Sequence, residues 1–332
     1  MLLGLSPFML IFVATALLFD FLNGFHDSAN AVATMISSRA MGPRKALILN
    51  AVANFIGPFL FGVAVAETIG HEVIAESAAS YTVILAALVG AILWNIFTWL
   101  MGIPSSSSHA LIGGLVGAAI IGNGFEAILL PGLEKVLLAL LLSPIIGMFS
   151  GFLLMKITLF LARGATPRIN HFFKHAQIVT ATTLALSHGA NDAQKTMGMI
   201  TMVLLVEGIL PHFVVPTWVI AACAGAMSLG TALGGWKIIR TLGSKFYKVR
   251  PVHSFTSQLA SAGIILGAAI FGGPVSTTQV VSTSILGAGS ADRVNKVRWG
   301  VVKEIMVAWL LTIPASGLFG ALVYLGLKYI GL

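Results

Sequence analysis

The chain has few charged residues. Only 9% of its 332 residues are Asp, Glu, Lys or Arg, whereas 57% are hydrophobic, and the mean hydropathy is +0.97. A soluble globule cannot cover its surface with so little polar material, so these values indicate a polytopic membrane protein. The formal net charge of +8 does not point to nucleic acid as a partner, because the basic residues lie in short loops between apolar runs.

Cysteine is almost absent as well. The single Cys223 lies in an apolar segment, which excludes disulfides within the chain and a cysteine-based metal site. The sequence also lacks a nucleotide-binding loop, a low-complexity stretch and a soluble domain. We expect no cleavable signal peptide, because the first apolar run leads into polar residues instead of a small-residue cleavage site.

Apolar runs make up most of the chain. They form about ten segments separated by short polar loops, which favours α-helices over the alternating strands of a transmembrane barrel. Two segments are too short to cross a bilayer, and each follows a proline and several Ser or Thr residues. We expect each to pair with the preceding run as a helical hairpin whose tip reverses inside the membrane. The segments are 6–36, 44–66, 81–103, 109–122, 134–162, 175–206, 213–234, 253–273, 279–290 and 299–328.

The charges of the loops predict the orientation. If the N-terminus is external, the cytoplasmic loops contain arginine and lysine, from Arg39 in the first loop to Arg298 in the last. The external loops then contain glutamate, with Lys135 and Lys328 as their basic residues. This asymmetry follows the positive-inside rule. We therefore expect a multi-pass protein of the plasma (inner) membrane with both termini external.

Two similar polar clusters interrupt the apolar segments. They are residues 23–30 (NGFHDSAN) and 187–195 (SHGANDAQK). Each precedes a Ser/Thr-rich tip at nearly the same distance along the chain, and the loop charges make the two segments enter the membrane from opposite sides. This order predicts an inverted-topology repeat of a secondary transporter, with its site near the midplane. The predicted divisions are 1–162 for the first repeat, 163–174 for a cytoplasmic linker and 175–332 for the second repeat.

Ionisable residues within these clusters indicate a functional site, because inserting each at bilayer depth costs roughly 2.5–3.5 kcal/mol on insertion scales. Asp27 and Asp192, with the amides Asn30 and Asn191, offer oxygen ligands for a hard cation or a carboxylate for a proton. An ion could thus enter together with a substrate. The alternative is that Asp192 pairs with Lys195 for structure alone. Three histidines adjoin the motifs and are candidate proton carriers or hydrogen-bond partners: His26, His109 and His188.

Proline followed by hydroxyl residues marks both hairpin tips. Residues 104–109 are PSSSSH and residues 274–279 are PVSTTQ. The proline ends one helix, and the hydroxyls can cap the N-terminus of the next. Two helix N-termini that enter from opposite faces suit a small tetrahedral oxyanion, since their N–H groups and positive ends point into the protein. The alternative is a pair of ordinary caps without a ligand.

At these four motifs the sequence resembles the inorganic phosphate transporter (PiT) family, whose signature is a Gly-Ala-Asn-Asp type motif once in each half. The resemblance spans essentially the whole chain. The first copy has Phe25 and His26 before its aspartate, and the second has Lys195 where sodium-coupled relatives tend to keep an asparagine. This pattern is similar to the compact bacterial low-affinity branch, which takes phosphate with protons or as a neutral metal-phosphate.

The resemblance implies that phosphate is held at the hairpin tips and a cation or proton near the motif aspartates. Lys195 can contact the anion as a point charge. The expected phosphate-binding residues are Ser105, Ser106, Ser107, Ser108, Ser276, Thr277, Thr278, Gln194 and Lys195. The expected residues for the coupling cation or proton are Asp27, Asn30, Asn191 and Asp192. No catalytic residue and no cofactor is expected.

The expected function is import of inorganic phosphate by symport with H⁺ or Na⁺, with protons favoured, through alternating access. A sulfate permease of the same fold is the alternative, because a hydroxyl-rich site fits either tetrahedral anion. Phosphate at neutral pH often has a proton that Asp27 or Asp192 can accept in a hydrogen bond, whereas sulfate has none. A divalent metal transported with phosphate and a homo-oligomer both remain open.

Other classes fit the sequence poorly. An anion channel would need a continuous polar pore, but the sparse polar residues gather at mid-membrane. An enzyme would need a nucleophile with its base, and Ser108 beside His109 has no third group and no nucleophile elbow. We therefore expect a transporter whose partners are phosphate, a coupling cation and the lipid bilayer.

Overall fold

The computed structural model describes residues 6–103, 105–240 and 246–331. Over these residues the regular structure is helical, apart from one isolated bridge between Ile74 and Ile128, which confirms the predicted all-α class. The helices are α1 (Pro7–Ser37), α2 (Pro43–Leu60), α3 (Ala64–His71), η2 (Glu76–Ala78), α4 (Tyr81–Met101), α5 (Ser107–Asn123), η3 (Phe125–Ala127), α6 (Leu130–Leu161), α7 (Ile169–Val206), α8 (Thr217–Leu233), α9 (Trp236–Arg240), α10 (Pro251–Ile270), α11 (Thr277–Asp292), η5 (Val294–Lys296) and α12 (Trp299–Tyr329).

Several helices have the length and composition of membrane spans. α1, α4, α6 and α12 are each long and apolar enough to cross a bilayer. The single segment expected over 44–66 is instead broken. α2 ends at Leu60 and α3 leaves it at an angle of 76°, so these two helices make a span only together. Gly62 takes a left-handed φ of +80° at the break, a conformation that favours glycine.

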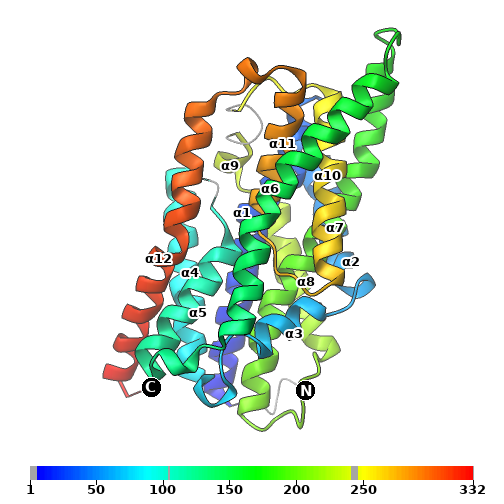
Figure 1. Cartoon of the computed structure of the whole chain (residues 1–332). Coiled ribbons are helices and arrows are strands. Elements are labelled where there is room, and N and C mark those ends of the chain that lie inside the picture. The colour runs from blue at the N-terminus through cyan, green and yellow to red at the C-terminus, as the bar shows by residue number, and fades with distance from the viewer. Residues whose placement is uncertain (1–5, 104, 241–245, 332) are drawn as a thin grey trace.

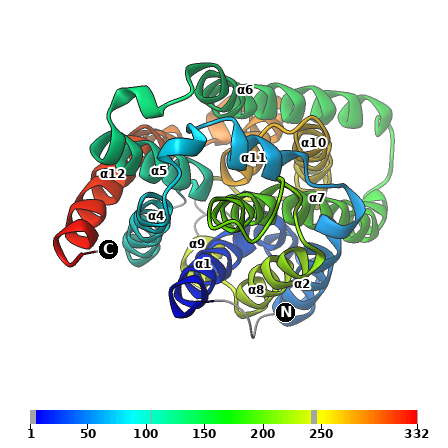
Figure 2. The same ribbon diagram turned by 90° about the horizontal axis from the view of Figure 1, so that it is seen from below.

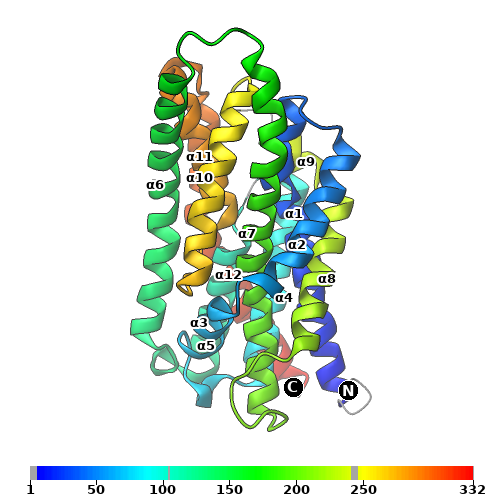
Figure 3. The same cartoon turned by 90° about the vertical axis from the view of Figure 1, so that its right-hand side faces the viewer.

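The longest helix, α7, contains the second polar cluster. It has 38 residues and begins at Ile169, inside the region predicted as the linker. At 1.5 Å per residue it is roughly 57 Å long, more than the thickness of a bilayer core. Its first turns therefore extend the helix toward the loop that joins it to α6, at the end of the bundle shown uppermost in Figure 3.

The two helices that contain the polar clusters, α1 and α7, run in opposite directions. α1 begins at the same end of the bundle at which α12 finishes, whereas α7 begins at the opposite end (Figures 1 and 3). The hairpin of α4 and α5 enters from the first end, and the hairpin of α10 and α11 enters from the other. Their tips meet inside the bundle, where Oγ of Ser108 donates a hydrogen bond to the carbonyl of Val275 at 3.0 Å.

Helices that precede the loop between α6 and α7 pack against helices that follow it. α1 packs on α8 and α2 on α7, while α5 packs on α12 and α11 on α6. Seen from below, α7 lies between the layer of α1, α8 and α2 and the layer of α6, α10 and α11 (Figure 2). The motif glycines permit the first two contacts. A Cβ added at Gly24 would overlap the backbone of Met227 in α8, and one at Gly189 would overlap the backbone of Asn54 in α2.

Candidate functional site

All the site residues predicted from the sequence are buried. The two motif aspartates come together at the tip of the hairpin formed by α10 and α11. Oγ1 of Thr277 lies 2.7 Å from Oδ2 of Asp192 and 3.4 Å from Oδ2 of Asp27, and Thr278 donates to Oδ1 of Asp27 at 2.7 Å. Asn30 in turn donates to the Thr278 hydroxyl at 3.2 Å. The N-terminal turn of α11 thus joins both carboxylates.

The tip of the other hairpin reaches the same cluster through Lys195. Its ammonium donates to a carboxylate oxygen of Asp192, to Oγ of Ser108 at 2.5 Å and to the carbonyl of Val275 at 3.1 Å. The side chain is almost fully buried, with an exposed fraction of 2%. One cation therefore connects α7, the start of α5 and Val275, which lies two residues before α11.

His188 lies between the two acids. Its Nε2 is 2.9 Å from Oδ2 of Asp192 and 3.8 Å from Oδ2 of Asp27. Its Nδ1 is 3.2 Å from Oδ1 of Asn54 in α2, and Nδ2 of Asn54 donates to Thr231 in α8 at 3.0 Å. Because an amide oxygen can only accept, this contact places a proton on Nδ1 and directs Nε2 at the carboxylates.

The cluster has the composition of a site for a cation or a proton. Asp27, His188 and Asp192 each place one ligand atom within 4.8 Å of the others. Two carboxylates and an imidazole can hold a hard or borderline cation, or exchange a proton among themselves. His26 adds a second imidazole, whose Nδ1 is 3.4 Å from Oδ1 of Asp27.

Other predicted residues bond to the protein around this cluster. Asn191 donates to the carbonyl of Gly273 at 3.1 Å, which ties α7 to the turn before the second tip. Gln194 points toward the break between α2 and α3, where it donates to the carbonyl of Gly62 at 2.7 Å and accepts from the backbone N–H of Val65 at 2.8 Å. Both amides therefore hold backbone in place next to the aspartates.

The serines of the first tip divide into two groups. Ser107 donates to Oδ1 of Asn23 at 2.8 Å, and Ser108 lies beside Lys195. Ser105 instead bonds to Thr98 within its own hairpin at 2.8 Å, and Ser106 caps α5 by accepting from the backbone of its third residue at 3.1 Å. In the second tip, Ser276 caps α11 in the same way through Gln279. Pro104 lies outside the described residues.

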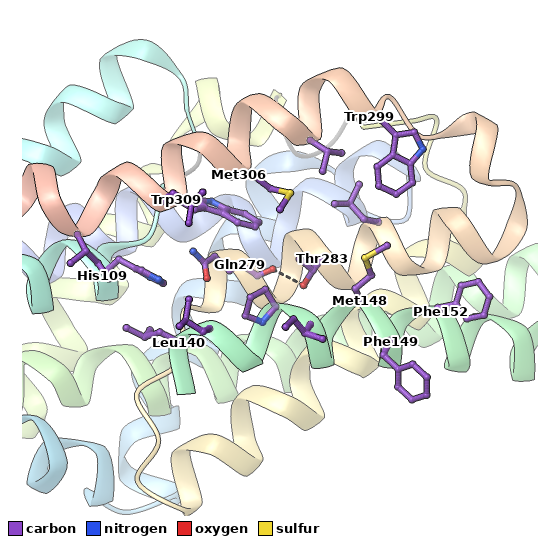
Figure 4. Close-up of a pocket in the computed structure, with 17 residues that line it drawn as sticks. His109, Leu140, Met148, Phe149, Phe152, Gln279, Thr283, Trp299, Met306 and Trp309 are labelled. Atoms are coloured by element: carbon purple, nitrogen blue, oxygen red, sulfur yellow. Dashed lines mark hydrogen bonds between the residues drawn. The ribbon is translucent and has the colours of Figure 1, made fainter. Parts of the chain in front are cut away.

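His109 bonds to the N-cap residue of its own helix. Its Nδ1 is 2.7 Å from Oγ of Ser106, and its ring lies at an apolar cavity of about 690 Å³ between α6, α11 and α12. Figure 4 shows His109 and Gln279, the last residues of the two tip motifs, beside this cavity. Its other lining side chains are mainly aliphatic and aromatic, so it lacks the convergent polar groups of an anion site.

Three groups of the site were not assigned from the sequence. Asn23 accepts the Ser107 hydroxyl, Asn54 orients His188, and the carbonyl of Val275 accepts from Lys195 and Ser108. Asn23 stands at the start of the first polar cluster, and Asn54 is an amide in an apolar run that also contains Asn50. Both amide side chains can be noticed in the sequence, whereas the role of a backbone carbonyl such as that of Val275 cannot be read from it.

Two hairpin tips that meet inside a bundle of apolar helices, at a buried pair of carboxylates, indicate a membrane transport protein. The chain matches the model of the phosphate transporter family over residues 23–320 and belongs to that family. This confirms the resemblance found in the motifs. Because the family and the similar proteins are transporters, it also confirms the expectation of a transporter instead of an enzyme.

Similar proteins match along nearly the whole chain. The chain is 47% identical to a probable low-affinity inorganic phosphate transporter of Bacillus subtilis, with 97% of each chain covered. It is 46% identical to one of Rhizobium meliloti, with 96% of each chain covered. A solved structure titled the sodium-dependent phosphate transporter superposes with a TM-score of 0.88 at 23% identity and covers 98% of this chain and 100% of the other. At that identity, the superposition establishes the fold.

Proposed function

We propose that this chain imports inorganic phosphate across the plasma membrane by symport with a proton or Na⁺. The observation that supports it best is the meeting of the α5 and α11 N-termini at Asp27 and Asp192. The first N–H groups of each helix have no acceptor within the helix, and hydroxyls surround both ends. Phosphate fits these donors, which are Ser107, Ser108, Thr277, Thr278 and Lys195.

Phosphate suits this site better than sulfate does. At neutral pH phosphate often has a hydrogen-bond donor of its own, and two buried carboxylates are acceptors for it. Sulfate has no such proton and would meet the carboxylates as like charges. The names of the similar bacterial proteins agree with this choice.

Coupling and transport are proposed from the same arrangement. Asp27, Asp192 and His188 provide the groups for a proton or a cation, including a divalent metal that enters with phosphate. The opposite directions of α1 and α7 and of the two hairpins support an inverted repeat divided at residues 163–174 (Figure 1). Alternating access would then move the two halves about the tips, with both termini external and the basic loops cytoplasmic.

Uptake of radiolabelled phosphate into proteoliposomes tests this function. The pH gradient and the Na⁺ gradient are imposed separately, with and without Mg²⁺, and unlabelled sulfate is added as competitor. We expect uptake driven by one of the gradients and unchanged by sulfate. Absence of phosphate uptake, or strong inhibition by sulfate, would support the sulfate permease instead.

A further inference from the structure

The two polar clusters occupy matching places but differ in charge. When Asp27 is aligned with Asp192, Asn23 matches His188 and Asn30 matches Lys195. The contacts follow this match. Asn30 donates to Thr278 at the second tip, and Lys195 donates to Ser108, the corresponding residue of the first tip. The same position therefore holds a neutral amide in one half and an ammonium in the other.

The groups around the Lys195 ammonium are those of an alkali-cation site. They are a carboxylate oxygen of Asp192, the hydroxyl of Ser108 and the backbone carbonyl of Val275. Hard cations such as Na⁺ take carboxylate, hydroxyl and carbonyl oxygens as ligands. A lysine ammonium is a compact point charge that can satisfy the same oxygens from a covalent tether.

The corresponding place in the first half has an unsatisfied hydrogen-bond acceptor. Oδ1 of Asn30, in a side chain with 2% exposure, has no hydrogen-bond partner among the described residues. Its Nδ2 is already bonded to Thr278, which donates to Asp27. A buried amide oxygen beside a carboxylate can serve as a ligand for a mobile cation, and the second half has the lysine nitrogen at this position.

We propose that Lys195 is a built-in cation that takes the place of one mobile alkali ion in the second half of the carrier. The protein then needs one exchangeable cation fewer per phosphate than a carrier with asparagine in both halves. Removing the ammonium and restoring an amide opens an Na⁺ site between Asp192, Ser108 and the carbonyl of Val275. This inference rests on the proposed function, since it concerns the ion that accompanies phosphate.

The test is equilibrium binding of radiolabelled phosphate to the purified full chain, at fixed pH, with choline replacing Na⁺ at constant ionic strength. Lys195→Asn reproduces the arrangement of Asn30, and Lys195→Gln is a second variant with a longer amide. Lys156→Asn, at an exposed site on α6, is the matched control. In Lys195→Asn we expect the slope of log binding constant against log Na⁺ concentration to exceed the wild-type slope by about one, as linkage requires for one added ion. The control keeps the wild-type slope.

The outcomes separate this inference from the function on which it rests. A wild-type chain that binds no phosphate at any Na⁺ concentration or pH overturns the proposed function. If the wild-type chain binds phosphate and folded Lys195 variants keep the wild-type slope, only the proposal that Lys195 replaces a mobile ion is overturned. Folded Lys195 variants that bind no phosphate even at high Na⁺ also overturn it, because Na⁺ would then be unable to take the place of the ammonium.

Discussion

The polar cluster of α1 and that of α7 have the same backbone setting but different chemistry. Each has its aspartate one turn from a motif glycine that lies against a helix of the other half, α8 for Gly24 and α2 for Gly189. Asp27 has neutral amides at the flanking positions Asn23 and Asn30, whereas Asp192 has His188 and Lys195. Such a pair of halves can share a fold while one provides a fixed charge and the other a place for an exchangeable ion.

Exchanging each aspartate for asparagine should reveal this difference most strongly. We expect both Asp27→Asn and Asp192→Asn to abolish phosphate uptake, because each removes a carboxylate from the cluster. Asp192→Asn should also lower the free energy of unfolding by about 3–5 kcal/mol, because it leaves the Lys195 ammonium buried without its partner. Asp27→Asn should cost less, about 1–3 kcal/mol, since the loss there is mainly of hydrogen bonds from hydroxyls.

Uptake into proteoliposomes and thermal unfolding in detergent measure these two effects. Glu126→Gln, at an exposed position of η3, is a control for the loss of one negative charge and should change neither. Near-normal uptake in either aspartate variant would remove that acid from the mechanism. Equal losses of stability in the two variants would contradict the difference between an aspartate paired with a lysine and an aspartate bonded to hydroxyls.

The two hairpin tips should differ in the next largest effect. The hydroxyl of Thr277 contacts both carboxylates, while that of Ser107 donates to the amide oxygen of Asn23. We expect Thr277→Ala to weaken the apparent affinity for phosphate about tenfold, the equivalent of one hydrogen bond of roughly 1.4 kcal/mol. Ser107→Ala should weaken it by a smaller factor.

The conservative exchanges Thr277→Ser and Ser107→Thr keep the hydroxyls and serve as controls in the same uptake assay. They should retain apparent affinities close to that of the wild-type chain. An unchanged affinity in Thr277→Ala would place the anion away from the tips. A larger loss of affinity in Ser107→Ala than in Thr277→Ala would mean that the first hairpin tip contributes more to phosphate binding than the second.

Much of this arrangement could be predicted from the sequence. Apolar runs and short charged loops indicate a helical membrane protein. The Pro-Ser/Thr motifs predict the starts of α5 and α11 to within a few residues. The aspartates could be singled out because an acid in an apolar run is costly. These signals are local in the chain, so a single sequence is enough to detect them.

The remaining features depend on contacts between distant segments. The break between α2 and α3 and the orientation of Gln194 toward it follow from how α3 packs on α7. The place of His109 at the apolar cavity likewise depends on which side of α5 faces α6, α11 and α12. Sequence spacing puts Gln194 next to Lys195 and His109 next to Ser108, but adjacent residues on a helix point in different directions.

Gln194 should give the smallest effect on transport, and the comparison of the halves explains why. Its counterpart in α1 is Ala29, so the first half works without an amide at this position. The side chain donates to the carbonyl of Gly62 and accepts from the N–H groups of Val65 and Ala66, at 2.8 and 3.3 Å. Its polar atoms are thus engaged by the start of α3 and not by the tips.

We therefore expect Gln194→Ala to leave the apparent affinity for phosphate within about twofold, while it lowers the free energy of unfolding by about 1–3 kcal/mol, because buried N–H groups lose their acceptor. Gln194→Glu keeps that acceptor at the N-terminus of α3 and should recover part of the stability, although it loses the donor to Gly62. Phosphate uptake and thermal unfolding measured on both variants separate the two roles. A tenfold or larger loss of affinity in Gln194→Ala, without loss of stability, would place this amide on the anion as the sequence alone suggested, and the two halves would then differ at a third position of the site.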